Sequence, residues 1–215
     1  RRAFTEGNGE EAARLTRENF NGKASYETQG EKDFRFGSFT TMGELHIATG
    51  IDEAKIRDYE RTLSVDSAFA TVNFTTADGT RYTRRAFISY PDNVLAVRFT
   101  ADRRGRQDLT LSYAPNPCAE GTIVPEGKDG LVYRAQLDNN GMRYVVRLRA
   151  VAKGGTVTNT DGRFTVKGAD EVTFLLTADT DYRMNLDPRF DDPKAYVGVD
   201  PERTTAKWMK AAARR

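Results

Sequence analysis

Apolar and polar residues alternate through most of the interval from residue 44 to residue 177, which is the period of a half-buried β-strand. The clearest case is a hairpin from about residue 67 to residue 89, where two alternating segments flank a turn at Asp78-Gly79. Further alternating segments lie at 95–99, 109–113, 131–137, 144–150, 157–166 and 172–176. Many short strands joined by Gly, Asn and Pro turns predict a mostly-β fold, an antiparallel β-sandwich.

Helical periodicity is confined to the two ends. Residues 9–22 predict a short amphipathic helix with Ala12 and Leu15 on one face and Gly22 as its C-terminal stop. A second helix is expected from Pro201 to the C-terminus, with Asp200 as its N-cap. It carries an apolar stripe of Trp208 and Ala212, opposite Lys207, Lys210 and Arg214.

Composition narrows the classes of partner. The 215 residues include 33 basic and 31 acidic side chains, a net charge of +2, which gives no whole-molecule reason to expect nucleic acid or an anionic membrane. No apolar run approaches the roughly 18 residues of a membrane span. The single cysteine, Cys118, excludes an intramolecular disulfide and a cysteine-rich zinc site, so no metal or cofactor is expected.

Candidate catalytic residues are few. His46 is the only histidine, and its position between Leu45 and Ile47 favours a surface or sheet-edge residue over a catalytic triad. Glycoside hydrolysis uses paired carboxylates, but no pair can be chosen by spacing. The acidic candidates are Glu44, Glu60, Asp66, Glu120, Asp181, Asp187, Asp191 and Asp192. The last three could bind calcium, although they lack the ligand spacing of a calcium loop, and solvated turn residues are the favoured interpretation.

Arginines recur along the predicted strands. A basic sheet face for nucleic acid is one interpretation, and a solvated outer face paired with nearby carboxylates is the favoured one. The residues are Arg81, Arg84, Arg85, Arg98, Arg143, Arg147 and Arg149.

Residues 59–102 carry a more specific pattern. It comprises Tyr59, Arg61, Leu63, Ala68, Asp78-Gly79, Tyr82, Arg84, Phe87, Ser89, Pro91-Asp92 and Val97. The segment resembles the signature stretch of the N-terminal β-sandwich of family-95 glycoside hydrolases, the α-L-fucosidase family, with a departure at Ser64-Val65-Asp66. Residues 18–22, 42–45 and 180–182 are similar to flanking elements of that domain. Phosphorylases of maltose-type disaccharides have a comparable sandwich.

The resemblance implies a super-sandwich domain over residues 1–183, truncated at its start, and a linker and helix over 184–215 that lead to an absent (α/α)6 catalytic barrel. It implies an inverting α-L-fucosidase or α-L-galactosidase of bacterial type, periplasmic or secreted. The barrel would be this domain's partner and would carry the oligosaccharide substrate. No catalytic residue carries over, so the chain alone is expected to be inactive. The alternative is an autonomous carbohydrate-binding or adhesion-type β-sandwich, which the expected core-facing aromatics disfavour.

Overall fold

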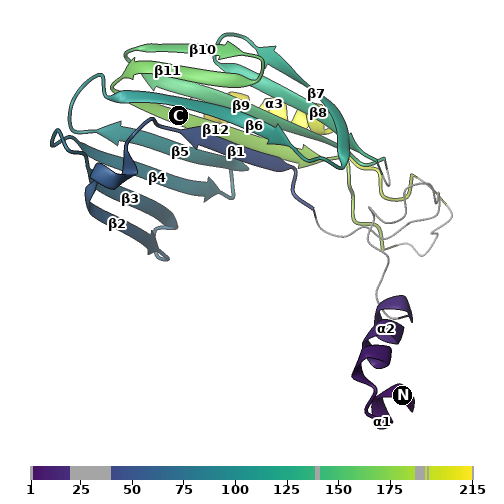
Figure 1. The fold of residues 1–215 in the computed structure, drawn as a ribbon. Coiled ribbons are helices and arrows are strands. Elements are labelled where there is room, and N and C mark those ends of the chain that lie inside the picture. The colour runs from purple at the N-terminus through teal and green to yellow at the C-terminus, as the bar shows by residue number, and fades with distance from the viewer. Residues whose placement is uncertain (1, 20–39, 139–140, 187–191, 193, 215) are drawn as a thin grey trace. The chain divides into compact units, whose positions relative to one another are not determined.

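The computed structural model describes residues 2–19, 40–138, 141–186, 192 and 194–214. They fall into two compact units, Arg1–Thr40 and Thr41–Arg215. The first unit contains α1 (Arg2–Thr5) and α2 (Gly9–Asn19) (Figure 1). The predicted helix over 9–22 is thus confirmed as far as Asn19, and residues 20–22 lie outside the described part of the chain.

Two antiparallel sheets make up the second unit, as the alternating pattern predicts. The smaller sheet has the order β1-β6-β11-β10, with β1 (Gly43–Ala48), β6 (Gln107–Pro115), β11 (Arg163–Ala169) and β10 (Thr156–Thr160). The larger sheet has the order β2-β3-β4-β5-β12-β9-β8-β7. Its strands are β2 (Arg57–Ser64), β3 (Phe69–Thr75), β4 (Arg81–Ser89), β5 (Val94–Ala101), β12 (Glu171–Thr180), β9 (Arg143–Lys153), β8 (Gly130–Leu137) and β7 (Ala119–Glu126).

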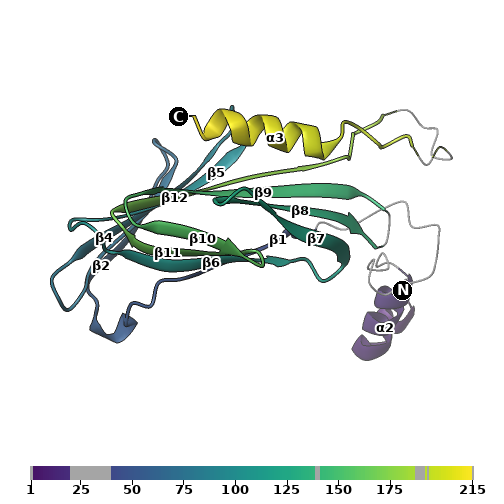
Figure 2. The ribbon, with the colours of Figure 1, turned by 90° about the horizontal axis from the view of Figure 1, so that it is seen from above.

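The main core lies between the two sheets, and Figure 2 shows the small sheet below the β12-β9-β8 part of the large one. Alternation places Leu111 of β6 and Phe164 of β11 on one side of this core and Phe174 of β12 and Leu148 of β9 on the other. All four are almost completely buried. Burying such side chains stabilises the fold by about 1.5–3 kcal/mol each, so this layer holds the sheets together.

The small sheet covers only part of the large one. Its strands β6, β10 and β11 approach β5 and β9. Beyond β5 the inner face of the large sheet continues across β4, β3 and β2. One row of paired residues shows this, because it runs from Phe174 of β12 to Leu63 of β2. The residues between them are Val97, Ala86 and Ala70. Leu63 is 73% exposed. Ile88, which lies two residues after Ala86 on β4 and faces the same side, is also 73% exposed. Within the described residues of this unit, the inner face of the large sheet is therefore uncovered around Leu63 and Ile88, whereas Phe74 of β3, on the same face, is 4% exposed.

Helix α3 (Pro201–Ala212) lies along the outer face of the large sheet, on the side away from the small sheet (Figure 2). Asp200 caps it as predicted, since the side-chain oxygen of Asp200 accepts the Glu202 amide at 3.2 Å. Met209 joins Val94, Ala96 and Leu175 in a second apolar cluster.

The packed stripe of α3 differs from the sequence expectation. Its buried positions are Pro201, Thr205 and Met209, whereas Trp208 is only half-buried. Ala212 does pack against the second cluster, and Lys207 and Lys210 are exposed as expected. A polar anchor at Thr205, described below, fixes this rotation of the helix.

Candidate functional site

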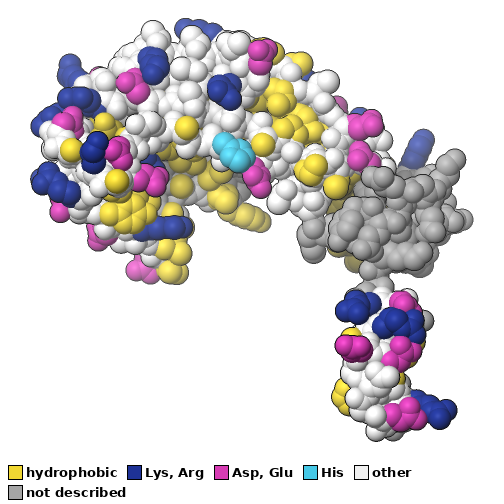
Figure 3. All heavy atoms as spheres, viewed as in Figure 1, with side chains coloured by type: hydrophobic (Ala, Val, Ile, Leu, Met, Phe, Trp, Pro, Cys, Tyr) yellow, Lys and Arg dark blue, Asp and Glu magenta, His cyan; other side chains and the backbone are white. Residues whose placement is uncertain are grey.

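His46 has the surface position that its neighbours predict. Leu45 and Ile47 pack against the core, and His46 points the other way from β1. The side chain of this single histidine, cyan in Figure 3, is at the surface, and its Nε2 lies 3.1 Å from a carboxylate oxygen of Glu44. Both side chains are more than half exposed. A surface pair of this kind lacks the buried nucleophile and orienting acid of a triad.

The acidic candidates that the structure describes lie on separate elements. Glu60 lies on β2 and Glu120 on β7, the opposite edges of the eight-stranded sheet. Seven interstrand spacings put them on the order of 33 Å apart, far more than the roughly 6.5–9.5 Å of an inverting carboxylate pair. Asp181 is buried, and its two oxygens accept the backbone N–H and the Nε–H of Arg143, both at 3.0 Å. Asp181 therefore clamps the end of β12 to β9.

Two acidic candidates lie in exposed turns or loops. Asp66 is exposed in the turn between β2 and β3, and Asp192, the one calcium candidate that the structure describes, is exposed and accepts the Lys194 amide. Asp187 and Asp191 lie outside the described part of the chain. Among residues that the structure describes, no three His, Cys, Asp or Glu side chains are grouped to hold a metal ion. The described helices are also too short or too polar to cross a bilayer.

The strand arginines divide into three groups, so a single solvated basic face is the wrong description. Arg98 and Arg149 do lie near the surface beside carboxylates, at 2.6 Å from Glu171 and 3.6 Å from Asp129. Arg147, in contrast, is 2% exposed beneath α3. Arg84 lies on the inner face of the large sheet, in the row of Phe99.

Arg147 connects β9 to α3. Its guanidinium pairs with Glu126 of β7 and Glu202 of α3, and its Nε donates to the Thr205 hydroxyl at 3.2 Å. Glu202 also accepts two hydrogen bonds from Arg134 of β8, each 2.8 Å. Because a buried charge is tolerated only when it is paired and hydrogen-bonded, this network holds the first turns of α3 on the sheet.

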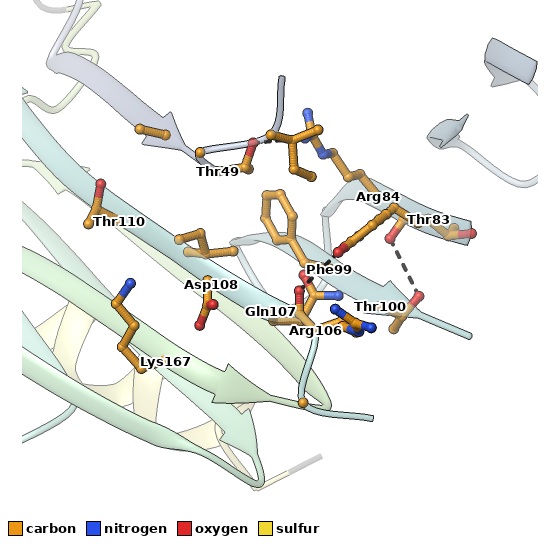
Figure 4. A pocket seen from close by; sticks show the side chains of 16 residues that line it. Thr49, Thr83, Arg84, Phe99, Thr100, Arg106, Gln107, Asp108, Thr110 and Lys167 are labelled. Atoms are coloured by element: carbon orange, nitrogen blue, oxygen red, sulfur yellow. Dashed lines mark hydrogen bonds between the residues drawn. The ribbon is translucent and has the colours of Figure 1, made fainter. Parts of the chain in front are cut away.

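A cavity of about 520 Å³ lies at the border between the part of the large sheet that the small sheet covers and the part that it leaves uncovered. Its walls are the end of β1 with the following loop, the inner faces of β4 and β5, and the start of β6 (Figure 4). Chemically informative lining residues are Thr49, Tyr82, Arg84, Phe99, Gln107 and Lys167. Its size falls in the range of small-molecule sites.

Arg84 is the central cation of this cavity. Its guanidinium carbon lies 4.9 Å from the ring centre of Phe74 and 5.7 Å from that of Phe99, which is cation–π geometry. One nitrogen donates to the Thr49 hydroxyl at 3.4 Å. Partial burial lowers the pKa of Arg84 from its ordinary value, because desolvation disfavours the charged form. Among the described residues, no carboxylate lies within ion-pair distance of it.

Gln107 is the residue that the sequence interpretation missed. It occupies the first position of β6, two residues before Leu109 and four before Leu111, so alternation turns it inward. It is 3% exposed, and its Nε2 has no hydrogen-bond partner among the described residues. The sequence did contain a signal for it, because a polar residue stands at a strand position where the alternation predicts an apolar one.

A comparison with known families decides the assignment. The model of the glycosyl hydrolase family 65 N-terminal domain matches residues 1–185. The chain belongs to this family. The expected resemblance to a glycoside-hydrolase N-terminal domain is confirmed at this level, and the chain itself has the sandwich that the alternating pattern predicts.

Two further proteins are similar to the chain. A protein of Aspergillus niger named probable alpha-fucosidase A is 31% identical over 157 residues, which are 68% of this chain and 19% of that protein. The structure of a putative kojibiose phosphorylase from the human microbiome superposes with a TM-score of 0.52 at 11% identity, over 80% of this chain and 25% of that one. The second likeness shows the fold alone. The chain spans about a fifth of the curated relative and a quarter of the solved structure.

Proposed function

We propose that this chain is the non-catalytic N-terminal sandwich of an inverting α-L-fucosidase or α-L-galactosidase, and that its partner is the catalytic barrel of the same protein. The observation that carries the proposal is the similarity to a protein named alpha-fucosidase, within a family of glycosyl hydrolase N-terminal domains. The pattern over residues 59–102, which resembles family-95 enzymes, supports the same specificity.

The distribution of acidic residues supports a non-catalytic role. The candidates that the structure describes lie on separate elements, and the one that is buried, Asp181, already has its oxygens engaged by Arg143. Hydrolysis would then take place in the barrel, with the sandwich stabilising that domain and contributing one wall of the sugar pocket. An enzyme of this kind acts on glycans outside the cytoplasm, so we propose export to the periplasm or the medium.

The test compares the chain with the longer protein that contains it. Both are incubated with a 2′-fucosylated oligosaccharide, and free fucose is measured. We expect turnover by the longer protein and none by the chain. Turnover by the chain that a single Asp or Glu substitution abolishes would overturn the non-catalytic role. Release of a sugar phosphate in phosphate buffer, without fucose, would overturn the fucosidase assignment in favour of a phosphorylase.

An autonomous carbohydrate-binding sandwich has one observation in its favour. Some aromatics do not face the core, and among them Tyr90 is 91% exposed and Tyr59 is 57% exposed. Exposed aromatic rings are the surfaces on which sugar rings stack. Glycan-array binding by the chain that Tyr90→Ala abolishes would favour this function, whereas unchanged binding would remove its support.

A further inference from the structure

We infer that the end of the large sheet at which β2 and β4 finish is an interface, and that the domain following α3 in the longer protein covers it. The identity of this partner rests on the proposed function, in which the following domain is the catalytic barrel. The surface that the partner covers is an apolar corner, made by Leu63, Val65, Ile88 and Tyr90.

The strand order brings these four residues to one end of the sheet. Strands β2 and β4 run in the same direction, because both are antiparallel to β3, which lies between them. Leu63 and Ile88 are the next-to-last residues of these strands and lie on the inner face. Val65 and Tyr90 begin the turns that follow. Figure 3 shows hydrophobic side chains, in yellow, at these strand ends.

Very little of the apolar corner is covered within the described residues. Leu63 and Ile88 are 73% exposed, Val65 is 86% exposed and Tyr90 is 91% exposed. One exposed apolar residue is ordinary, but four neighbours make a patch of roughly a few hundred Å², the size at which a patch marks an interaction site. The other end of this sheet differs, because Asp78 in the turn between β3 and β4 lies 3.4 Å from Arg106.

The chemistry of the apolar corner fits a protein better than a glycan. A sugar ring that stacks on an aromatic side chain also needs polar groups placed beside it. Three of the four side chains are aliphatic, and Ser89, the neighbour of Tyr90, donates its hydroxyl to Asp92 at 2.7 Å. Apolar surface with a tyrosine is typical of the buried centre of a protein interface.

The position of α3 selects the partner. Its last turn packs beside the start of β5, because Ala212 and Ala213 pack against the cluster that contains Val94 and Met209. Only the turn over residues 91–93 separates Val94 from Tyr90. Polypeptide that follows α3 therefore starts close to the apolar corner. The family is one of N-terminal domains, and the matched segment is 19% of the curated relative, so such a protein has enough further chain to cover this surface.

The experiment is hydroxyl-radical footprinting of the chain and of the longer protein, with oxidation of each side chain measured by mass spectrometry. Tyr90 should be oxidised at least roughly fivefold more slowly in the longer protein, because the centre of an interface excludes water. Leu63 and Ile88 should be slowed in the same way. Tyr59 is the internal control, since it is 57% exposed near the start of β2 and outside the apolar corner. Its oxidation should be equal in the two proteins.

Ile88→Asp tests the contact directly, and Val151→Asp is its matched control. An unpaired carboxylate is unfavourable in a buried interface, so Ile88→Asp should restore Tyr90 oxidation in the longer protein to the rate in the chain. Val151 is an apolar residue of β9 that is 44% exposed and alternates to the other face of the sheet. Val151→Asp should leave Tyr90 protected. Circular dichroism establishes that each variant is folded, and the comparison of the unsubstituted proteins needs neither variant.

Equal oxidation of Tyr90 in the chain and in the longer protein overturns the inference, whether or not the longer protein releases fucose. Protection of Tyr90 without fucose release supports the interface and counts only against the fucosidase assignment. Protection of Tyr90 in the chain by an added oligosaccharide would make the apolar corner a sugar-binding surface. Protection in the chain that is lost on dilution would make it a contact between two copies. Either of these last two results overturns the inference.

Discussion

The attachment of α3 to the sheet can be tested through Arg147. Replacing it by Met keeps a long apolar stem beneath the helix but removes the cation that joins Glu126, Glu202 and Thr205. We expect the docked helix to be released before the sheet unfolds. The single tryptophan, Trp208, lies on α3 and is half-buried, so its fluorescence reports the docking of this helix.

The magnitude follows from the exposure of the partners. Removing one member of a fully buried ion pair costs about 3–5 kcal/mol. Here the two glutamate side chains are 45% and 35% exposed, and Glu202 keeps Arg134, so water and Arg134 offset part of the loss. We therefore expect Arg147→Met to lower the free energy of unfolding by about 2–3 kcal/mol.

The assay is urea denaturation followed by Trp208 fluorescence and by far-ultraviolet circular dichroism. In Arg147→Met the fluorescence midpoint should fall below the dichroism midpoint. Arg98→Met is the control, since the Arg98 side chain is 54% exposed and its 2.6 Å pair with Glu171 should contribute about 0–1 kcal/mol. A loss of stability in Arg147→Met no larger than in Arg98→Met would refute the anchoring role.

Two further predictions concern the core and a turn. Phe164→Ala should destabilise the chain by about 3–5 kcal/mol in urea unfolding, because Phe164 is fully buried between the sheets, whereas the exposed Ile88→Ala should cost less than about 1 kcal/mol. Asp78 should contribute to acid unfolding, because hydrogen bonds from the Thr76 hydroxyl and the Thr80 amide hold its pKa well below the ordinary value. A depressed folded-state pKa gives stability above the unfolded pKa near 4 that is lost as pH falls, so Asp78→Asn should flatten the dependence of stability on pH between about 5 and 2. Identical profiles for wild type and Asp78→Asn would contradict this.

The strands that the sequence predicts well are those with one solvent-exposed face and one buried face. The hairpin of β3 and β4 is one example, and the hairpin of β10 and β11 is another, where Asp161-Gly162 adopts positive φ at both residues of the turn. The two edge strands of the large sheet escaped prediction. Strand β2 is exposed along its whole length, so its sequence shows no regular alternation of apolar and polar residues. Strand β7 contains Gly121 and Pro125, which disfavour the interior of a sheet but are tolerated in an edge strand.

The parts of the candidate site could not be predicted because they depend on register between distant segments. Arg84 and Arg85 look equivalent in the sequence, and only the pairing of β4 with β5 turns the first toward Phe99 and the cavity. Burial of Arg147 likewise depends on a helix that begins more than fifty positions later and supplies Glu202. Gln107 was detectable in principle, as a polar residue in line with Leu109 and Leu111, but its missing partner is a property of the assembled structure.

The pairing of β5 with β12 has a consequence for synthesis on the ribosome. Thr100 lies opposite Glu171, so the segments that form the middle of the large sheet are made far apart in time. Until β12 emerges, β2 to β5 can form only a local meander whose last strand has an open edge, a template for pairing with another chain. Helix α3 then emerges and covers Val94, Ala96 and Leu175. A nascent chain that stalls before residue 171 thus has an unpaired edge, and one that stalls before residue 201 still displays an apolar face.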